Sequence, residues 1–130
     1  MEELIEKFLD NKNVFAVIGV SRDPEKYGHK VYKDLKKAGY TVYPINPKAE
    51  SIDGDKCYNS LRELPERPDV VDIVVPPKIT ERIIKECKEL GIKRVWMQPG
   101  SESEEAISFC KENDIEVIHS VCVMVERKKR

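Results

Sequence analysis

One short segment of the chain places small and basic residues directly after an apolar run. The run covers residues 14–18, and Gly19, Val20, Ser21 and Arg22 follow it. An apolar stretch without alternation is typical of a central strand in a parallel sheet that helices cover on both faces. In such a fold the turn after the first strand leads into a helix N-terminus, where unpaired backbone N–H groups can hold a phosphate. The turn at Gly19 is therefore expected to bind a phosphate-bearing ligand.

Four further segments have the composition of site loops. Each follows a predicted strand and contains proline, glycine or polar residues: Asn46-Pro47-Lys48, Val75-Pro76-Pro77-Lys78, Gln98-Pro99-Gly100 and His119-Ser120-Val121-Cys122. Each of these segments, taken alone, is consistent with an ordinary turn. The carboxyl ends of parallel strands lie at one edge of the sheet, and ligands bind there in folds of this class. Together with the turn at Gly19, these segments therefore predict one site.

The regions between these loops alternate between strand and helix patterns. Strands are predicted at residues 14–18, 40–45, 70–75, 94–97 and 115–118, and helices at 2–11, 29–38, 79–90 and 102–110. A leading helix followed by alternating strands and helices implies a parallel sheet with right-handed crossovers. The predicted fold is α/β, a Rossmann-like, doubly wound sheet of about five parallel strands with helices on both faces. One domain is expected to span residues 1–130.

Local signals add detail to this plan. Ser60 and Ser101 each precede a glutamate by three residues, which is the spacing of a capping box at a helix start. His29, at the start of the second helix, is expected to be exposed or to cap that helix. The basic end Arg127–Arg130 is expected to be a frayed, solvated terminus.

Composition limits the classes of partner. The 130 residues contain 23 Lys and Arg against 24 Asp and Glu, a net charge of −1, so neither nucleic acid nor a membrane surface is an expected partner. No apolar stretch approaches the length of a membrane span, and the acidic N-terminus is unlike a signal peptide, which predicts a cytoplasmic location. Charged residues make up 36 % of the chain and Gln98 is its single glutamine, a thermophile-like composition.

The four cysteines do not predict a metal centre. Cys57, Cys87, Cys110 and Cys122 lie far apart in the chain and form no C-x-x-C pair. Cys87 and Cys110 fall within apolar helical patterns and are expected in the core. No catalytic set of residues stands out either, because His119 and Cys122 are joined only by a short spacing in a tail of unknown conformation.

A dinucleotide site is the obvious comparison, and two features argue against it. The G-x-G-x-x-G fingerprint is absent, since the next glycine after Gly19 is Gly28. NAD favours an acidic residue after the second strand, whereas this chain has Lys48. A lysine there suits a ribose that carries a phosphate, as in NADP and coenzyme A (CoA), and the missing fingerprint disfavours NADP.

Four blocks in this order carry a family resemblance: residues 17–21 (VIGVS), 42–48 (VYPINPK), 74–77 (VVPP) and 96–100 (WMQPG). They resemble the family of small, stand-alone CoA-binding proteins. That family is similar in fold to the CoA-binding N-terminal domain of the succinyl-CoA synthetase alpha subunit. The resemblance covers residues 10–125 and implies that the chain binds CoA or an acyl-CoA as a carrier or regulatory protein.

The resemblance also implies roles for individual residues. Gly19, Val20 and Ser21 would form the turn that holds the pyrophosphate, and Arg22 and Lys26 would add positive charge there. A second group would shape the adenosine end, with Lys48 near the 3′-phosphate: Pro44, Asn46, Pro47 and Lys48. A third group would wall the adenine and the pantetheine arm: Val75, Pro76, Pro77, Met97, Gln98, Pro99 and Gly100.

Other interpretations remain open from the sequence. Cys122 follows the last strand and can meet the CoA thiol, with which it would form a mixed disulfide under oxidation. A buried tail cysteine is the simpler interpretation of the same residue. The chain can also be an NAD(P)-using oxidoreductase with a degenerate Rossmann site, or a non-catalytic partner subunit. A homo-oligomer is compatible with all of these.

Overall fold

The sheet at the centre of the molecule has five parallel strands, as predicted. The computed structural model describes all 130 residues of the chain. The strands are β1 (Val14–Ile18), β2 (Thr41–Ile45), β5 (Val70–Ile73), β6 (Arg94–Met97) and β7 (Glu116–Ile118). They lie in the order β2-β1-β5-β6-β7, and every neighbouring pair is parallel. The chain therefore leaves β1 in one direction to form β2 and returns past it to form β5, which makes the β1/β5 boundary the topological switch point.

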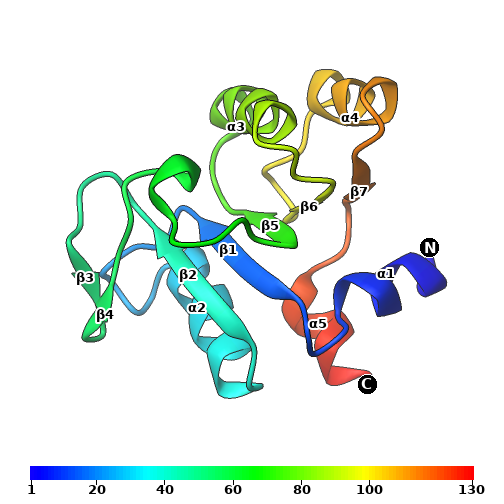
Figure 1. Ribbon diagram of the computed structural model, residues 1–130. Helices are drawn as coiled ribbons and strands as arrows, with labels where there is room; N and C mark the ends of the chain where they lie inside the picture. Colours follow the sequence, from blue (N-terminus) through cyan, green and yellow to red (C-terminus); the bar gives the residue numbers. More distant parts are fainter.

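Helices cover both faces of this sheet (Figure 1). One face carries α1 (Glu2–Phe8), α2 (Tyr27–Lys37) and α5 (Val123–Lys128), and the other carries α3 (Pro77–Glu89) and α4 (Glu104–Glu112). Phe8 and Trp96 meet edge to face in the first of the two cores, whereas Ile84 and Met97 belong to the second. The apolar residues of the central strands are buried on both sides, which is why they show no alternation in the sequence.

Two capping boxes predicted from the sequence are wrong. Ser60 precedes the short 3-10 helix η1 (Leu61–Glu63) and accepts no hydrogen bond through its side chain. The cap of α4 is Ser103, whose Oγ accepts from the backbone N–H of Ala106 at 3.0 Å. Ser101 instead points back to the β5–α3 loop, where its Oγ accepts from the N–H of Val75 at 3.1 Å. The serine that caps the helix is therefore the one next to its first turn.

A two-stranded hairpin lies beside α2 in the region that the sequence left irregular. It consists of β3 (Ser51–Ile52) and β4 (Asp55–Lys56), which pair in antiparallel fashion. Asp53 and Gly54 form its turn and both have positive φ angles, 50° and 84°, as two-residue hairpin turns require. The hairpin brings two aspartates, Asp53 and Asp55, against the lysines of α2.

The basic C-terminus is not frayed, contrary to the sequence-based expectation. It forms α5, and Arg127 makes a two-pronged ion pair with Asp34 of α2 at 2.7 and 2.8 Å. Arg130 contacts Glu2 and donates to the carbonyl of Glu126, which joins the two ends of the chain. None of the helices combines the length and apolar character that crossing a membrane requires.

Candidate functional site

The loops after β1, β2 and β5 meet at the carboxyl edge of the sheet. The N–H groups of Gly19 and Val20 both donate to the carbonyl of Ile45 at the end of β2, at 3.1 and 3.2 Å. On the other side, the N–H of Val74 donates to the carbonyl of Ile18 at 2.9 Å. The turn at Gly19 is thus fixed between its two neighbouring strands, at the switch point of the sheet.

Two glycines allow this turn to pack tightly. Gly19 has a φ of +95°, and a Cβ on it would overlap the carbonyl oxygen of Val74. A Cβ on Gly28, in the first turn of α2, would overlap the carbonyl oxygen of Gly19. Gly28 therefore fills the packing role of the last glycine of a dinucleotide fingerprint, at a longer spacing. The standard spacing of that fingerprint does not reveal it, because Gly28 lies nine residues after Gly19.

The turn offers backbone donors to a ligand. The N–H groups of Ser21 and Arg22 donate to no acceptor in the chain, while the Ser21 Oγ accepts from the N–H of Asp23 at 3.0 Å. Arg22 and Lys26 are both exposed beside the turn. Free N–H groups next to a helix N-terminus, with mobile cations at the rim, suit a phosphate or diphosphate.

Asn46 links this turn to the loop after β2. Its Nδ2 donates to the carbonyl of Val20 at 2.8 Å, and its Oδ1 accepts from the N–H of Lys48 at 2.8 Å. The amide is therefore occupied by the protein itself and positions the two loops relative to each other. Pro47 and Lys48 are exposed at the rim, where Lys48 can reach a ligand.

An apolar cavity of about 280 Å³ adjoins the turn on the α3 side of the sheet. Its wall includes Pro47 after β2, Val75 after β5, and Ile79, Arg82 and Ile83 of α3. Both isoleucines are only half-buried. Because α3 starts at Pro77, its first turns continue the loop after β5 and belong to the site. The cavity can take a flat apolar group and offers one guanidinium beside it.

Comparison with known proteins agrees with this geometry. Residues 13–128 match the model of a family described as a CoA binding domain. The chain belongs to the CoA-binding domain family. It is 44 % identical over 86 residues to the alpha subunit of an ADP-forming acetate–CoA ligase II of Pyrococcus furiosus. That match covers 65 % of this chain but 19 % of the ligase subunit, so the chain spans about a fifth of this curated relative.

Other relatives have the length of this CoA-binding domain. Protein YneT of Bacillus subtilis, which is uncharacterized, is 31 % identical over 121 residues, covering 93 % of this chain and 90 % of its own. A conserved hypothetical protein of Pyrococcus furiosus has a solved structure that superposes with a TM-score of 0.84 at 45 % identity, covering 88 % of this chain and 98 % of that one. A hypothetical protein of Pyrococcus horikoshii gives a TM-score of 0.93 at 34 % identity, covering 99 % and 91 %.

Several residues that the sequence assigned to the site have buried side chains in this CoA-binding domain. They are Val20, Pro44, Met97 and Gln98. Pro44 lies inside the edge strand β2, where its carbonyl accepts from the N–H of Tyr58 at 3.0 Å. Met97 packs in the core beneath α3 and α4. Pro76, Pro77, Pro99 and Gly100 are exposed at the same edge of the sheet. The accessible part of the predicted set consists of these exposed residues together with Gly19, Ser21, Arg22, Lys26, Asn46, Pro47, Lys48 and Val75.

Gln98 is the centre of a buried polar network in the domain. Its Nε2 donates to Asp72 Oδ1 at 2.6 Å, and its Oε1 accepts from the N–H of Val123 at 3.1 Å and from the hydroxyl of Tyr27 at 3.0 Å. The Cys122 sulfur lies 2.7 Å from the Tyr27 oxygen. Because the phenol has one hydrogen, which it donates to Gln98, the Cys122 thiol is the donor to the Tyr27 oxygen. Gln98 therefore joins α2 and α5 to the centre of the sheet.

Asp72 sits at the inner end of this network. It is fully buried in β5, and its Oδ2 makes no hydrogen bond. Burial raises the pKa of this carboxyl to about 7, although the hydrogen bond from Gln98 opposes the shift. Burial of the Tyr27 side chain likewise raises the pKa of its phenol. Both groups are thus neutral hydrogen-bonding groups over the acidic half of the pH scale.

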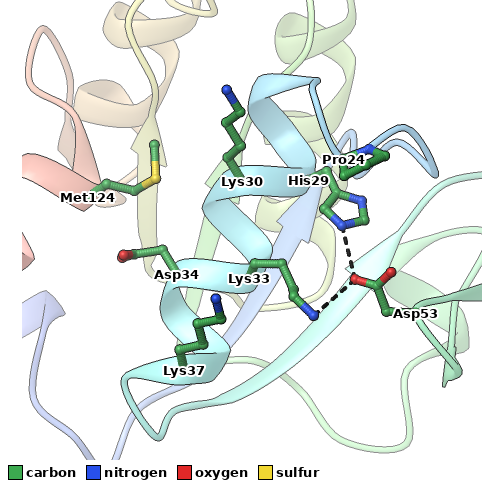
Figure 2. Close-up of a pocket in the computed structure, with 8 residues that line it drawn as sticks. All are labelled: Pro24, His29, Lys30, Lys33, Asp34, Lys37, Asp53 and Met124. Carbon is green, nitrogen blue, oxygen red and sulfur yellow. Dashed lines mark ion pairs between the residues drawn. The ribbon is translucent and has the colours of Figure 1, made fainter.

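His29 is buried, contrary to the expectation of an exposed or capping residue. Only 3 % of its surface is exposed. Its Nδ1 lies 2.6 Å from the carbonyl oxygen of Ser21, and its Nε2 lies 2.9 Å from Asp53 Oδ2. Figure 2 shows that Lys33 reaches the same carboxylate, at 3.2 Å. The partner aspartate comes from a hairpin that the sequence did not reveal, which is why the environment of His29 was missed.

Proposed function

We propose that this chain binds CoA or an acyl-CoA at the carboxyl edge of its sheet and serves as a carrier or regulatory binding protein. The observation that carries the proposal is the junction of the Gly19 turn with the apolar cavity at the β1/β5 switch point. The turn supplies free N–H groups for a diphosphate, and the cavity supplies an apolar slot for a base. Membership of the CoA-binding domain family selects CoA among ligands that have both groups.

The diphosphate would lie against the turn of Gly19 and Ser21, where the N–H groups of Ser21 and Arg22 are free. The guanidinium of Arg22 and the ammonium of Lys26 would neutralise part of its charge. Both side chains are exposed, so they can follow the ligand without changing the fold.

The adenine would enter the cavity between Pro47 and α3. Val75, Ile79 and Ile83 offer apolar surface to its faces, and the planar guanidinium of Arg82 can stack on it. This assignment adds three residues of α3 to the site predicted from the sequence. It also places the ribose next to Lys48, which supports a contact between that lysine and the 3′-phosphate.

The pantetheine arm would run from the turn across Pro76 and Pro77 towards Pro99 and Gly100. Met97 and Gln98 would then support this path from below, because their side chains are buried. Cys122 lies further along the same edge, against Tyr27. A mixed disulfide between Cys122 and the CoA thiol stays a proposal, and intact mass with and without reductant tests it.

Titration calorimetry with CoA and dephospho-CoA tests the ligand and the role of Lys48. Wild-type protein should bind CoA more tightly than dephospho-CoA by about tenfold, because one charge-assisted contact at an exposed site is lost. The variant Lys48→Met should lower the affinity for CoA to that for dephospho-CoA. Lys12→Met is the matched control, since Lys12 is exposed at the opposite edge of the sheet, before β1.

Two outcomes would contradict the proposal. Equal binding of CoA and dephospho-CoA would remove Lys48 from the 3′-phosphate. Tighter binding of NADP than of CoA, or NADP released from the purified protein on denaturation, would favour the nucleotide-using oxidoreductase instead. Mass spectrometry of the released small molecules distinguishes these cases without any assumption about affinity.

A further inference from the structure

His29 contacts the phosphate-binding turn and the β3–β4 hairpin at the same time. It lies in the first turn of α2, and its ring fills the space between Ser21 on one side and Asp53 on the other. These partners come from segments far apart in the chain. A single buried ring thus connects the candidate site to a surface hairpin (Figure 2).

The two contacts of the ring define its protonation state. A carbonyl oxygen can only accept, so Nδ1 must carry a hydrogen to bond Ser21 at 2.6 Å. At Nε2 the partner is a carboxylate oxygen at 2.9 Å, which also only accepts. Lys33 and His29 hold the pKa of Asp53 below its usual range, so this carboxyl is ionised. Both contacts are therefore hydrogen bonds only when both ring nitrogens carry hydrogens, which is the imidazolium form.

The charged groups around the ring are few. Lys30 and Lys33 lie on the same helix, and Lys33 shares Asp53 Oδ2 with the ring. Asp53 is the acidic group of the hairpin turn, while the β1–α2 loop presents Pro24 and the Ser21 carbonyl. The carboxylate thus balances the buried imidazolium, and a neutral ring would turn a lone pair towards Asp53.

The Ser21–Arg22 peptide transmits the effect of this ring to the turn. No peptide bond in the chain is cis, so the carbonyl of Ser21 and the N–H of Arg22 point in opposite directions. His29 holds the carbonyl side, and the N–H on the other side is one of the free donors of the turn. A hydrogen bond from a cation at the carbonyl polarises the peptide and strengthens its N–H as a donor.

We propose that His29 is a positioning residue of the phosphate-binding turn, and that anion binding at this turn is coupled to protonation of its imidazole. The inference rests on the proposed function, since it concerns the regulation of the same site. The imidazolium orients the Ser21–Arg22 peptide and adds positive charge behind it. By linkage, a bound diphosphate stabilises the protonated ring, so binding takes up protons and weakens as the pH rises.

Calorimetric titration with dephospho-CoA between about pH 6 and pH 8 tests the coupling. This probe lacks the phosphate monoester of CoA, which would itself titrate there. For wild-type protein the affinity should fall about fivefold over the range, the effect of one charge several ångströms from the ligand. Titrations in two buffers of different ionisation enthalpy should show uptake of a fraction of a proton.

His29→Asn is the decisive variant, because its Nδ2 can still donate to Ser21 while the charge is gone. Its affinity should match that of wild type at high pH and should not change over the range. Asp53→Asn is the second variant, and asparagine tolerates the φ of 50° at this position. Because this variant lacks the carboxylate that pairs with the ring, the pH dependence of its affinity should weaken. His119→Asn removes the other histidine of the chain and Asp72→Asn removes the buried carboxyl whose pKa is about 7. Both are controls and should keep the wild-type dependence.

The outcomes separate the two proposals. A pH profile of His29→Asn that equals the wild-type profile would overturn the coupling while leaving CoA binding intact. A profile lost in His119→Asn or Asp72→Asn would assign the proton elsewhere and overturn it as well. Failure of wild-type protein to bind either CoA or dephospho-CoA at any pH would overturn the proposed function itself.

Discussion

Asp72 is an acidic residue in a position that favours its neutral form. It lies in a central strand with no exposed surface, and only one of its oxygens is hydrogen-bonded. Its pKa in the folded protein is about 7, whereas an unfolded chain has the ordinary value of 3.8. Between these two values the folded state binds more protons than the unfolded state. Stability therefore falls as the pH rises from about 4 to about 7 and stays low above that range.

The variant Asp72→Asn should abolish this dependence, because an amide does not titrate in this range. At pH 8 it removes the cost of a buried charge, roughly 4 kcal/mol from the difference in pKa, and adds an unpaired amide N–H that costs about 1–3 kcal/mol. Its melting temperature should therefore lie below that of wild type near pH 4 and above it near pH 8. Scanning calorimetry across this range measures the difference.

Asp114→Asn is the matched control for this experiment. Asp114 is exposed and has a φ of 57°, which asparagine also adopts, so the two melting curves should differ by the same amount at every pH. A constant difference for Asp72→Asn as well would contradict the raised pKa of the buried carboxyl.

Single residues show where sequence reasoning about the site reached its limit. Loop composition and the family resemblance predict Ser21 and Lys48 at the site, and the structure leaves both accessible. For Gln98 and His29 the neighbours in sequence are a poor guide, because their partners Asp72, Val123 and Asp53 lie far from them along the chain. Burial of a polar side chain depends on such distant partners, which local composition does not reveal.

At the scale of elements, the strands of the main sheet and four of the helices follow from hydrophobic pattern. The strands β1 and β6 coincide with their predicted ranges, and the other three differ by one or two residues at one end. The β3–β4 hairpin and α5 were not predicted, because two-residue strands and a six-residue helix are too short to show a period. Contacts across the molecule, such as that between Arg127 and Asp34, hold α5 in place.

The approach of α2 to the turn of β1 leads to a prediction for Gly28. In an open helix, Gly→Ala stabilises by up to about 1 kcal/mol through helix propensity. Here the added Cβ would overlap the Gly19 carbonyl oxygen, which is backbone and cannot rotate away. Gly28→Ala should therefore destabilise the protein by about 1–3 kcal/mol and weaken CoA binding by moving the N-terminus of α2.

Urea unfolding followed through the Trp96 fluorescence measures the stability of the Gly28 variant, since this ring is fully buried in the core. Calorimetry with CoA measures the accompanying loss of affinity. An alanine that raised the unfolding midpoint would show that α2 and the turn are not in close contact.

At the scale of the whole molecule, the proposed ligand would connect parts of the fold that otherwise touch only through the sheet. The turn after β1, the loop after β2, the first turns of α3 and the loop after β6 all lie along its path. The sheet holds their backbones in place, but several of the side chains at the rim are exposed and free to move. A ligand that contacts all four segments should therefore stabilise the domain as a unit.

Thermal unfolding with added CoA measures this stabilisation. A ligand that binds only the folded state at one hundred times its Kd adds about 2.7 kcal/mol, which should raise the Tm of a domain of this size by about 8–12 °C. Pantetheine alone, which lacks the adenosine and the phosphates, should give a much smaller shift, because it reaches neither the Gly19 turn nor the cavity beside Ile79. If pantetheine raised the Tm as much as CoA does, the arm rather than the nucleotide would dominate binding, and the assignment of the turn and the cavity would be wrong.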